Sequence, residues 1–294
     1  MTWTVLSDNR TNDQALEMTE QRTQPQTCLG YAESRRNCCE VETEHGLSVL
    51  LQTEKHNILL DTGASGIFVR NAERMGIDLS SVDYVFISHG HSDHAGGLRY
   101  FLELNQRAKV IVSSAAISGQ FFSKRAHLHS ITAVWPFIPE ERLLMVDETC
   151  EIADGVHVIA HIPQVHPKPK GNQNLFVETD DGLLVPDDFR HELALYTDGL
   201  LFTGCAHSGL ENILAACPWP VRCVLGGFHL LDGFESDEEL TALARRLEDK
   251  YPNTHFYTSH CTGNHAFEVL KHLLEDHLHS FNCGCRKEFC DLPL

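Results

Sequence analysis

The order of strand and helix patterns along the 294 residues predicts an α/β fold, in which two mixed β-sheets pack together with helices outside. Hairpin patterns at residues 46–60 and 192–202 each precede a series of strand–helix units, so the order roughly repeats in the second half of the chain. Residues 237–250 form a strong amphipathic helix pattern, whose apolar face can cover a sheet. The 42% hydrophobic composition is sufficient for a large core.

The other elements follow from short apolar runs and the turn residues between them. Strands are expected at residues 2–6, 85–87, 109–113, 143–145, 156–159, 175–178, 222–225 and 255–258. Helices are expected at residues 66–75, 95–104, 208–216 and 264–277. Residues 10–40 and 114–140 lack such periodicity, and we expect them to be loop decorations on a single domain that spans residues 1–294.

Charge and hydropathy limit the partners of this chain. The formal net charge of −18 argues against nucleic acid, because a phosphate backbone requires a basic face. No apolar run approaches the ~20 residues that span a bilayer, and the N-terminus has no secretory signal. We therefore expect a soluble, cytoplasmic protein with a small-molecule substrate and no nucleic-acid or membrane partner. The sequence leaves the oligomeric state open.

Residues 88–98, SHGHSDHAGGL, place three imidazoles and a carboxylate within six residues, between a predicted strand and a predicted helix. Histidine and carboxylate are the ligands that Zn²⁺ and similar divalent ions prefer. His89 and His91, two residues apart on extended backbone, can chelate one ion, and Asp93 with His94 can reach a second. The alternative is a histidine-rich surface loop, but the spacing and the strand–turn–helix context favour a metal site.

This stretch resembles the HxHxDH signature of the metallo-β-lactamase-fold superfamily, and the resemblance implies an αββα sandwich. Asp61 matches the superfamily's first motif, where an aspartate orients metal-binding histidines from behind, and His260 matches a histidine on the second metal. Most members carry Gly-Asp where this chain carries Gly204 and Cys205, so the aspartate that bridges two metals is missing here.

The missing aspartate leads us to expect His207, two residues further on, as the replacement ligand. Cys205 itself is a weaker candidate ligand, a redox-sensitive thiol or a packed side chain. The superfamily's third ligand position falls near Asp188, a weak candidate, with His191 as its alternative. His229 lies at a strand end on the same rim, where it can contact substrate, donate a proton or ligate.

The ordered motifs LDTG, SHGHxDHxGGL, GCxHxG, GGFHL and HCTG narrow the resemblance. They are similar to those of the metal-dependent hydrolases grouped with a dihydropterin–ribofuranosylaminobenzene 5'-phosphate synthase, over about residues 2–285. The resemblance implies chemistry on a small anionic substrate, phosphorylated or pterin-like, at a divalent metal centre. Zinc, as one or two ions, is the first expectation, and iron and manganese are alternatives.

The leading hypothesis is a metal-dependent hydrolase, or a related lyase or transferase, in which the metal lowers the pKa of a bound water. Asp93 would ligate or orient that water, and His229 or a second metal would stabilise charge on the substrate oxygen. A di-iron redox or oxygen-handling protein and a non-catalytic, metal-stabilised binding module are the alternatives.

The 11 cysteines are an odd number, and without an export signal they do not predict a disulfide framework. A separate cluster of cysteines, called here the second cysteine cluster because it does not include Cys205, could make its own zinc site. The spacing of these cysteines in the chain instead favours buried thiols or thiols without a function. The members of this cluster are Cys28, Cys38, Cys39, Cys283, Cys285 and Cys290.

Overall fold

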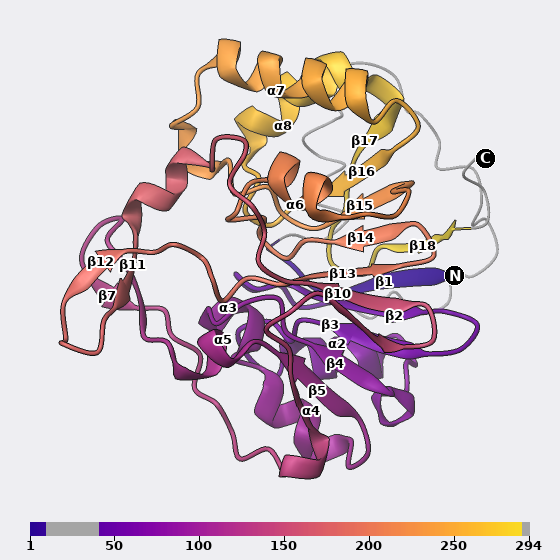
Figure 1. The fold of residues 1–294 in the computed structure, drawn as a ribbon. Helices are drawn as coiled ribbons and strands as arrows, with labels where there is room; N and C mark the ends of the chain where they lie inside the picture. The colour runs from indigo at the N-terminus through magenta and orange to yellow at the C-terminus, as the bar shows by residue number, and fades with distance from the viewer. Residues whose placement is uncertain (10–40, 290–294) are drawn as a thin grey trace.

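The computed structural model describes residues 1–9 and 41–289, and these form two seven-stranded mixed sheets that pack face to face (Figure 1). The first sheet contains, in spatial order, β18 (Arg286–Glu288), β1 (Thr2–Ser7), β2 (Ser48–Gln52), β3 (Asn57–Leu60), β4 (Tyr84–Phe86), β5 (Lys109–Val112) and β8 (Leu143–Met145). The second contains β17 (Leu278–Ser280), β16 (His255–Thr258), β15 (Cys223–Leu225), β14 (Leu200–Phe202), β13 (Ala194–Thr197), β10 (Val156–Ile159) and β9 (Cys150–Ala153).

Helices cover the outer face of each sheet, which confirms the predicted αββα sandwich (Figure 1). The first sheet is covered by α2 (Ile67–Arg74), α3 (Ser92–Ala95), α4 (Leu98–Leu104) and α5 (Ser114–Ser118). The second is covered by α6 (Leu210–Ala216), α7 (Asp237–Lys250) and α8 (Asn264–Leu274). The chain also contains five short 3₁₀ helices among the described residues: η1 (Leu79–Ser81), η2 (Glu140–Arg142), η3 (Lys170–Asn174), η4 (Leu231–Gly233) and η5 (Glu275–His277).

The core between the sheets is apolar and rich in aromatic rings that meet edge to face. Trp3 of the first sheet meets Tyr257 of the second with ring centroids 5.2 Å apart, and Phe86 meets Phe202 at 6.1 Å. Burying a large apolar side chain contributes about 1.5–3 kcal/mol, so this layer is a main source of the fold's stability. It also holds rigid the strand ends from which the site residues project.

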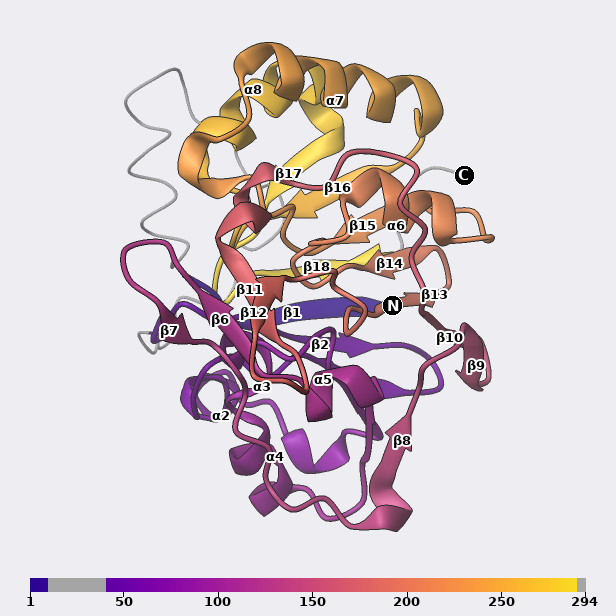
Figure 2. The same ribbon diagram turned by 60° about the vertical axis from the view of Figure 1, so that its left-hand side comes forward.

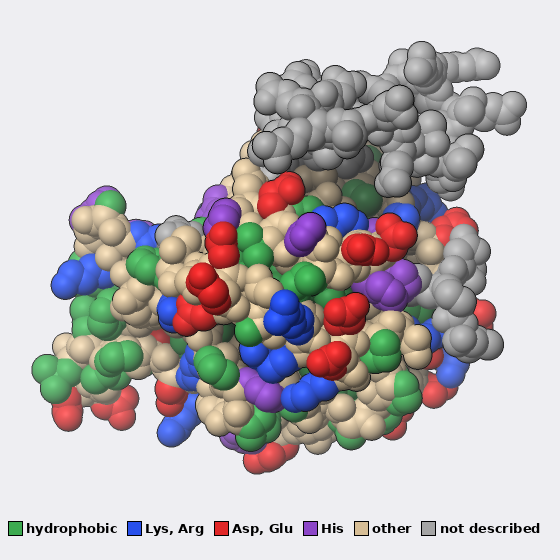
Figure 3. Space-filling model, turned by 90° about the horizontal axis from the view of Figure 1, so that it is seen from above, with side chains coloured by type: hydrophobic (Ala, Val, Ile, Leu, Met, Phe, Trp, Pro, Cys, Tyr) green, Lys and Arg blue, Asp and Glu red, His purple; other side chains and the backbone are tan. Residues whose placement is uncertain are grey.

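Helix α7 has the bounds that its pattern predicted, and the structure shows why it begins where it does. The Ser236 hydroxyl accepts a hydrogen bond from the Glu239 N–H while the Glu239 carboxylate accepts one from the Ser236 N–H, a reciprocal capping box. Seen from above, this side of the molecule carries acidic and basic side chains interspersed (Figure 3). Nowhere in residues 1–9 and 41–289 does a helix combine the length and apolar character that crossing a bilayer requires.

The prediction that residues 114–140 are irregular is wrong for part of this segment, whereas residues 133–139 do lack helix and strand. Residues 114–130 contribute α5, β6 (Phe121–Ser123) and β7 (His129–Ser130), and the two strands join β11 (Leu175–Glu178) and β12 (Leu184–Pro186) in a third, antiparallel sheet. This sheet projects from the side of the sandwich (Figure 1) and comes forward in the view of Figure 2. Its central pairing joins Phe121 to Val177, a partner far along the chain, so no local pattern signals it. The other predicted loop, residues 10–40, lies outside the described residues.

Candidate metal centre

The candidate ligands lie where loops leave the ends of adjacent strands in both sheets. Several of these loops turn through left-handed backbone at a residue other than glycine: Asp61 (φ 56°) after β3, Ala206 (φ 55°) after β14, His229 (φ 50°) after β15 and His260 (φ 51°) after β16. Such conformations cost of order 1 kcal/mol or more each and persist only where the surroundings fix them. Here they bend each loop sharply toward one point between the sheets.

A first set of imidazoles consists of His89, His91 and His207. Their ring centroids are 4.5–5.0 Å apart, and all are buried. Within the described part of the chain, the Nε2 atom of each ring has no hydrogen-bond partner. His89 and His207 are anchored through Nδ1, to the Ser88 hydroxyl at 2.8 Å and to the Asn172 side-chain oxygen at 3.1 Å. The unpaired nitrogens are therefore those that a metal would use.

Burial keeps these three rings neutral, which is the form of histidine that binds metal. It holds the pKa of His89 and of His207 well below the usual range, and it lowers the pKa of His91 to about 3. Neighbouring imidazoles lower all three further. The cluster is thus a set of uncharged nitrogen donors.

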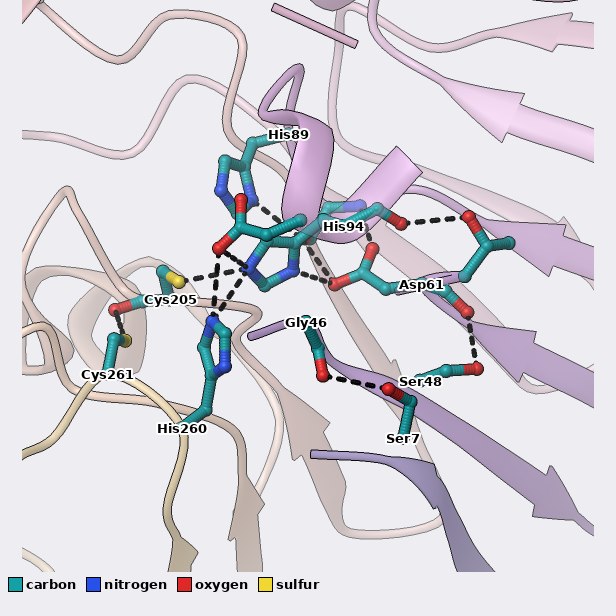
Figure 4. Close-up of polar contacts among 12 residues, drawn as sticks. Ser7, Gly46, Ser48, Asp61, His89, His94, Cys205, His260 and Cys261 are labelled. Carbon is teal, nitrogen blue, oxygen red and sulfur yellow. Dashed lines mark hydrogen bonds and ion pairs between the residues drawn. The ribbon is translucent and has the colours of Figure 1, made fainter. Parts of the chain in front are cut away.

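A second set consists of His94, His260 and Asp93. Figure 4 shows a nitrogen atom of the His94 ring pointing toward a nitrogen atom of the His260 ring. The Nε2 atoms of His94 and His260 are 3.2 Å apart, and Asp93 Oδ2 lies 3.7 Å and 3.4 Å from them. Each ring is anchored on its far side, His94 Nδ1 by Asp61 at 2.6 Å and His260 Nδ1 by Asn9 at 3.2 Å. These three side chains together offer two nitrogen donors and a carboxylate.

Asp61 lies behind His94, in the orienting position that the sequence predicts. It is fully buried, and its carboxylate accepts hydrogen bonds from the Ser88 N–H (2.7 Å), the Ser88 hydroxyl (2.8 Å) and His94 Nδ1–H (2.6 Å). An ionised carboxylate only accepts, so this contact places the proton of His94 on Nδ1 and leaves Nε2 free to ligate.

Cys205 lies between the two sets. Its sulfur is 3.1 Å from His94 Nε2. The sulfur lies within 4.8 Å of donor atoms of His89 and His207, and also within 4.8 Å of donor atoms of His94 and His260. A tetrahedral ion with bonds of 2.0–2.3 Å separates its donors by about 3.3–3.8 Å, so small rearrangements close either group around an ion. The donor chemistry and the unpaired nitrogens therefore fit a divalent metal.

Glu192 fixes the loop that carries Cys205 and His207. Its two carboxylate oxygens accept the backbone N–H groups of His207 and Ser208, both at 2.7 Å, and burial raises the pKa of this carboxyl. No sequence pattern distinguishes Glu192 from other acidic residues near a strand.

The structure does not bring Asp188 to the centre, so the prediction of Asp188 as a weak candidate metal ligand is wrong. Its side chain is 56% exposed and pairs with Arg190 at 2.8 Å, because the turn before β13 directs Asp187 and Phe189 inward and Asp188 outward. The alternative, His191, is buried beside the first set, but both its nitrogens are occupied: Nδ1 accepts the N–H of Gly90 and Nε2 lies 3.1 Å from Asp187. His191 therefore supports the loop of His89 and His91.

Two residues at the centre were not among the candidates from the sequence, although one of them, Cys261, belongs to the HCTG motif. His45 has its Nε2 atom 3.3 Å from Asp93 and its ring stacked on His260 at 5.1 Å, and its side chain is 58% exposed. Cys261 is buried, with its sulfur 3.7 Å from the carbonyl oxygen of Cys205. His229, which its strand end was expected to place beside the ligands, lies next to His207 with ring centroids 4.2 Å apart and is buried like them.

The second cysteine cluster is only partly described. Cys283 is buried, and its thiol donates to the carbonyl oxygens of Leu6 and Glu42, both at 3.4 Å, which are the contacts of a packed structural thiol. Cys28, Cys38, Cys39 and Cys290 lie outside the described residues.

Comparisons with known proteins agree with this geometry. The family model of the Metallo-beta-lactamase superfamily matches residues 41–253. An uncharacterized protein of Methanocaldococcus jannaschii is 29% identical over 78% of this chain and 88% of its own length. The 7,8-dihydropterin-6-methyl-4-(beta-D-ribofuranosyl)-aminobenzene-5'-phosphate synthase of the same organism is 24% identical over 82% of this chain and 89% of its own.

Among solved structures, one described as a metal-dependent hydrolase of the beta-lactamase superfamily superposes with a TM-score of 0.76. It is 27% identical, and the match covers 99% of this chain and 100% of the other. The shared architecture therefore extends over the described sandwich as a whole.

Proposed function

Because this chain belongs to the metallo-beta-lactamase superfamily, whose members bind divalent metals, we propose that it is a metal-dependent hydrolase, or a related lyase or transferase, acting on a small anionic substrate. The observation that carries the proposal is the pair of histidine sets. In the first set the Nε2 atoms have no hydrogen-bond partner among the described residues, and in the second set the Nε2 atoms of the two rings face each other. The side chain of Asp93 is 20% exposed, so water or substrate can reach the carboxylate beside the second set, which favours a catalytic metal over a purely structural one.

One ion would be held by His89, His91 and His207, and another by Asp93, His94 and His260, with the sulfur of Cys205 in reach of both groups. Nitrogen, oxygen and sulfur donors together suit zinc, and iron or manganese are alternatives. A divalent ion bound there supplies Lewis acidity and brings the pKa of a water toward neutrality.

The residues of the chain supply positioning and proton transfer. Asp93 reaches solvent beside the second set and orients the attacking water by accepting its hydrogen bond. His45, exposed and in contact with Asp93, is the imidazole that can hand a proton to the leaving group. His229, the other residue expected to act in the reaction, is buried beside His207, and the proposal assigns it no step.

The relative named as a dihydropterin–ribofuranosylaminobenzene phosphate synthase supports a phosphorylated or pterin-like substrate. A cation lies near the first set: Lys168 Nζ is 5.2 Å over the ring of Phe189, which stacks on His207 with centroids 4.7 Å apart. The same Nζ donates to the carbonyl oxygen of Asp188 at 3.0 Å. Lys170, the other lysine of this loop, is instead paired with Glu239 at 2.6 Å.

Metal removal tests the proposal. The protein, freed of metal with a chelator and reloaded with Zn²⁺, Mn²⁺ or Fe²⁺, is expected to turn over an anionic member of a panel of phosphoesters, lactones and pterin phosphates, and only when loaded. The His89→Ala variant is expected to lose this turnover, while His161→Ala, which changes a 61%-exposed histidine paired with Glu148, keeps it. An absorption spectrum distinguishes an iron centre from a zinc centre. Failure of the fully loaded protein on every compound would contradict the proposal.

Replacing His45 by alanine is expected to lower kcat by about a hundredfold, the usual contribution of a general acid or base, with metal content unchanged. The reason is its position: it is exposed and touches Asp93, and its donor atom lies within 4.8 Å of donors of Asp93 and His260. Kinetics combined with metal analysis checks the prediction. A loss of bound metal in this variant would show instead that His45 is a ligand.

A further inference from the structure

Two thiols and an imidazole lie together beside the histidine sets, and two of these residues, His229 and Cys261, have no part in the proposed reaction. We propose that Cys205, His229 and Cys261 form a further metal-binding position, which takes a thiophilic ion of the Zn²⁺ class and shares the Cys205 sulfur with the histidine centre. This proposal concerns metal binding and does not require that the protein be a hydrolase.

The three donor atoms lie within 4.8 Å of one another, and the three residues are only 3%, 4% and 2% exposed. Three donors of a tetrahedral ion, two sulfurs and one nitrogen, stand about 3.3–3.8 Å apart, so the cluster is close to the required size. Figure 4 shows the side chain of Cys261 next to that of Cys205, on the side away from His89. Two thiolates and one imidazole are a donor set that selects zinc and softer ions over Mg²⁺ or Ca²⁺.

His229 provides the independent observation. Neither of its ring nitrogens has a hydrogen-bond partner among residues 1–9 and 41–289, although both are buried. A neutral imidazole always carries one donor and one acceptor, and leaving both unpaired in the interior is costly. The residue also holds left-handed backbone, at φ 50°. A metal ligand in this position would give a reason for both features.

The chain leaves room for the sulfur. Gly227, just after β15, lies against Cys261, and a Cβ atom at this glycine would overlap Sγ. The adjoining Gly226 has a φ of 147°, which brings its backbone against Gly204 and Thr203. Close approach of two loops without intervening side chains keeps the Cys261 sulfur beside Cys205 and prevents an ordinary packing residue from filling the space.

Cobalt is the probe that tests this position, because Co²⁺ replaces zinc and thiolate ligands give it a near-ultraviolet charge-transfer band. The full-length protein, reduced and stripped of metal, is titrated with Co²⁺ alone. The wild type is expected to show the band, and Cys261→Ser to lose about half its intensity because one of two thiolates is gone. Cys223→Ser, which changes another fully buried thiol, on β15, is the matched control and is expected to match the wild type. An unchanged band in Cys261→Ser, or no band in the wild type, would overturn the proposal.

X-ray absorption of the zinc-loaded wild type gives a second measurement that needs no variant. It is expected to find two sulfur neighbours per chain at about 2.3 Å, the usual zinc–sulfur distance. One sulfur neighbour, from Cys205 only, or none would refute the position. Turnover is measured separately: a protein with the two-sulfur signal and no activity keeps this inference and loses the proposed function, and an active protein without the signal does the reverse.

Discussion

Asp61→Asn is expected to weaken metal binding by about 10–100-fold, the usual effect of losing the partner that orients a ligating histidine. Turnover at limiting metal is expected to fall by at least as much. The fold is expected to survive, because asparagine has nearly the same shape as the fully buried aspartate. Isothermal titration with Zn²⁺ and a thermal melt of the metal-free protein measure the two effects separately.

The reason is the position of one proton. Asp61 Oδ1 already accepts the N–H of Ser88, so the amide oxygen of an asparagine must take that place. Its NH₂ group then faces His94 Nδ1, which can no longer donate and must accept. The proton of His94 moves to Nε2, the atom that faces His260 and Cys205, and the lone pair that would bind metal is lost.

Asp61→Ala is expected to add a loss of stability of about 3–5 kcal/mol, because it leaves the Ser88 N–H and the His94 ring buried without their partner. Asp187→Asn is the matched control. It changes a second buried Asp–His pair, with a 3.1 Å contact, whose histidine is occupied on both nitrogens. Metal affinity should therefore fall far less in Asp187→Asn than in Asp61→Asn, and equal losses would show that the effect is a general loosening.

The centre could be predicted from the sequence where its ligands are close together in the chain or at recurring strand ends. Residues 88–98 carry His89, His91, Asp93 and His94 on one strand–turn–helix unit, so local geometry alone brings their side chains together. Hydrophobic patterns likewise predicted α7 and most strands of the two large sheets, because an alternating or amphipathic pattern records which face is buried.

The rest depends on contacts between distant segments, which a local pattern does not contain. His45 follows the long segment 10–40 and meets Asp93 only because the residues just before β2 contact residues 88–98, where the Leu47 N–H donates to the Asp93 carbonyl oxygen. Asp188 was wrongly predicted to point toward the centre. Side chains in the turn before β13 alternate between inward and outward, so an error of one residue reverses the expected direction. His229 lies at a strand end, as the sequence indicated, but its contact with His207 and its place beside Cys205 and Cys261 depend on distant segments.

Gly97→Ala is expected to destabilise the protein by about 3 kcal/mol, the upper end of the usual cost of overfilling a packed interior. A Cβ atom here would overlap the carbonyl oxygen of Thr62 and lie 2.6 Å from that of Ser65, and neither backbone atom can rotate away. Because Thr62 follows Asp61 and Gly97 follows the helix of His94, the strain would separate that pair and weaken metal binding as well. Denaturant unfolding of the metal-free protein measures the stability term.

Gly66→Ala separates this steric cost from the conformational effect of losing a glycine. Gly66 and Gly97 have nearly the same backbone angles, φ −80° and ψ 12° against φ −81° and ψ −9°, which alanine adopts without strain. At Gly66 the new Cβ meets only the Tyr100 side chain, at 3.2 Å, and this ring can shift. Since alanine gains about 0.4–1 kcal/mol at a compatible glycine position, Gly66→Ala is expected to stay within about 1 kcal/mol of the wild type. Similar stabilities for the two variants would mean that the loops after β3 and α3 are not packed backbone to backbone, and the close approach that joins Asp61 to His94 would have to be redrawn.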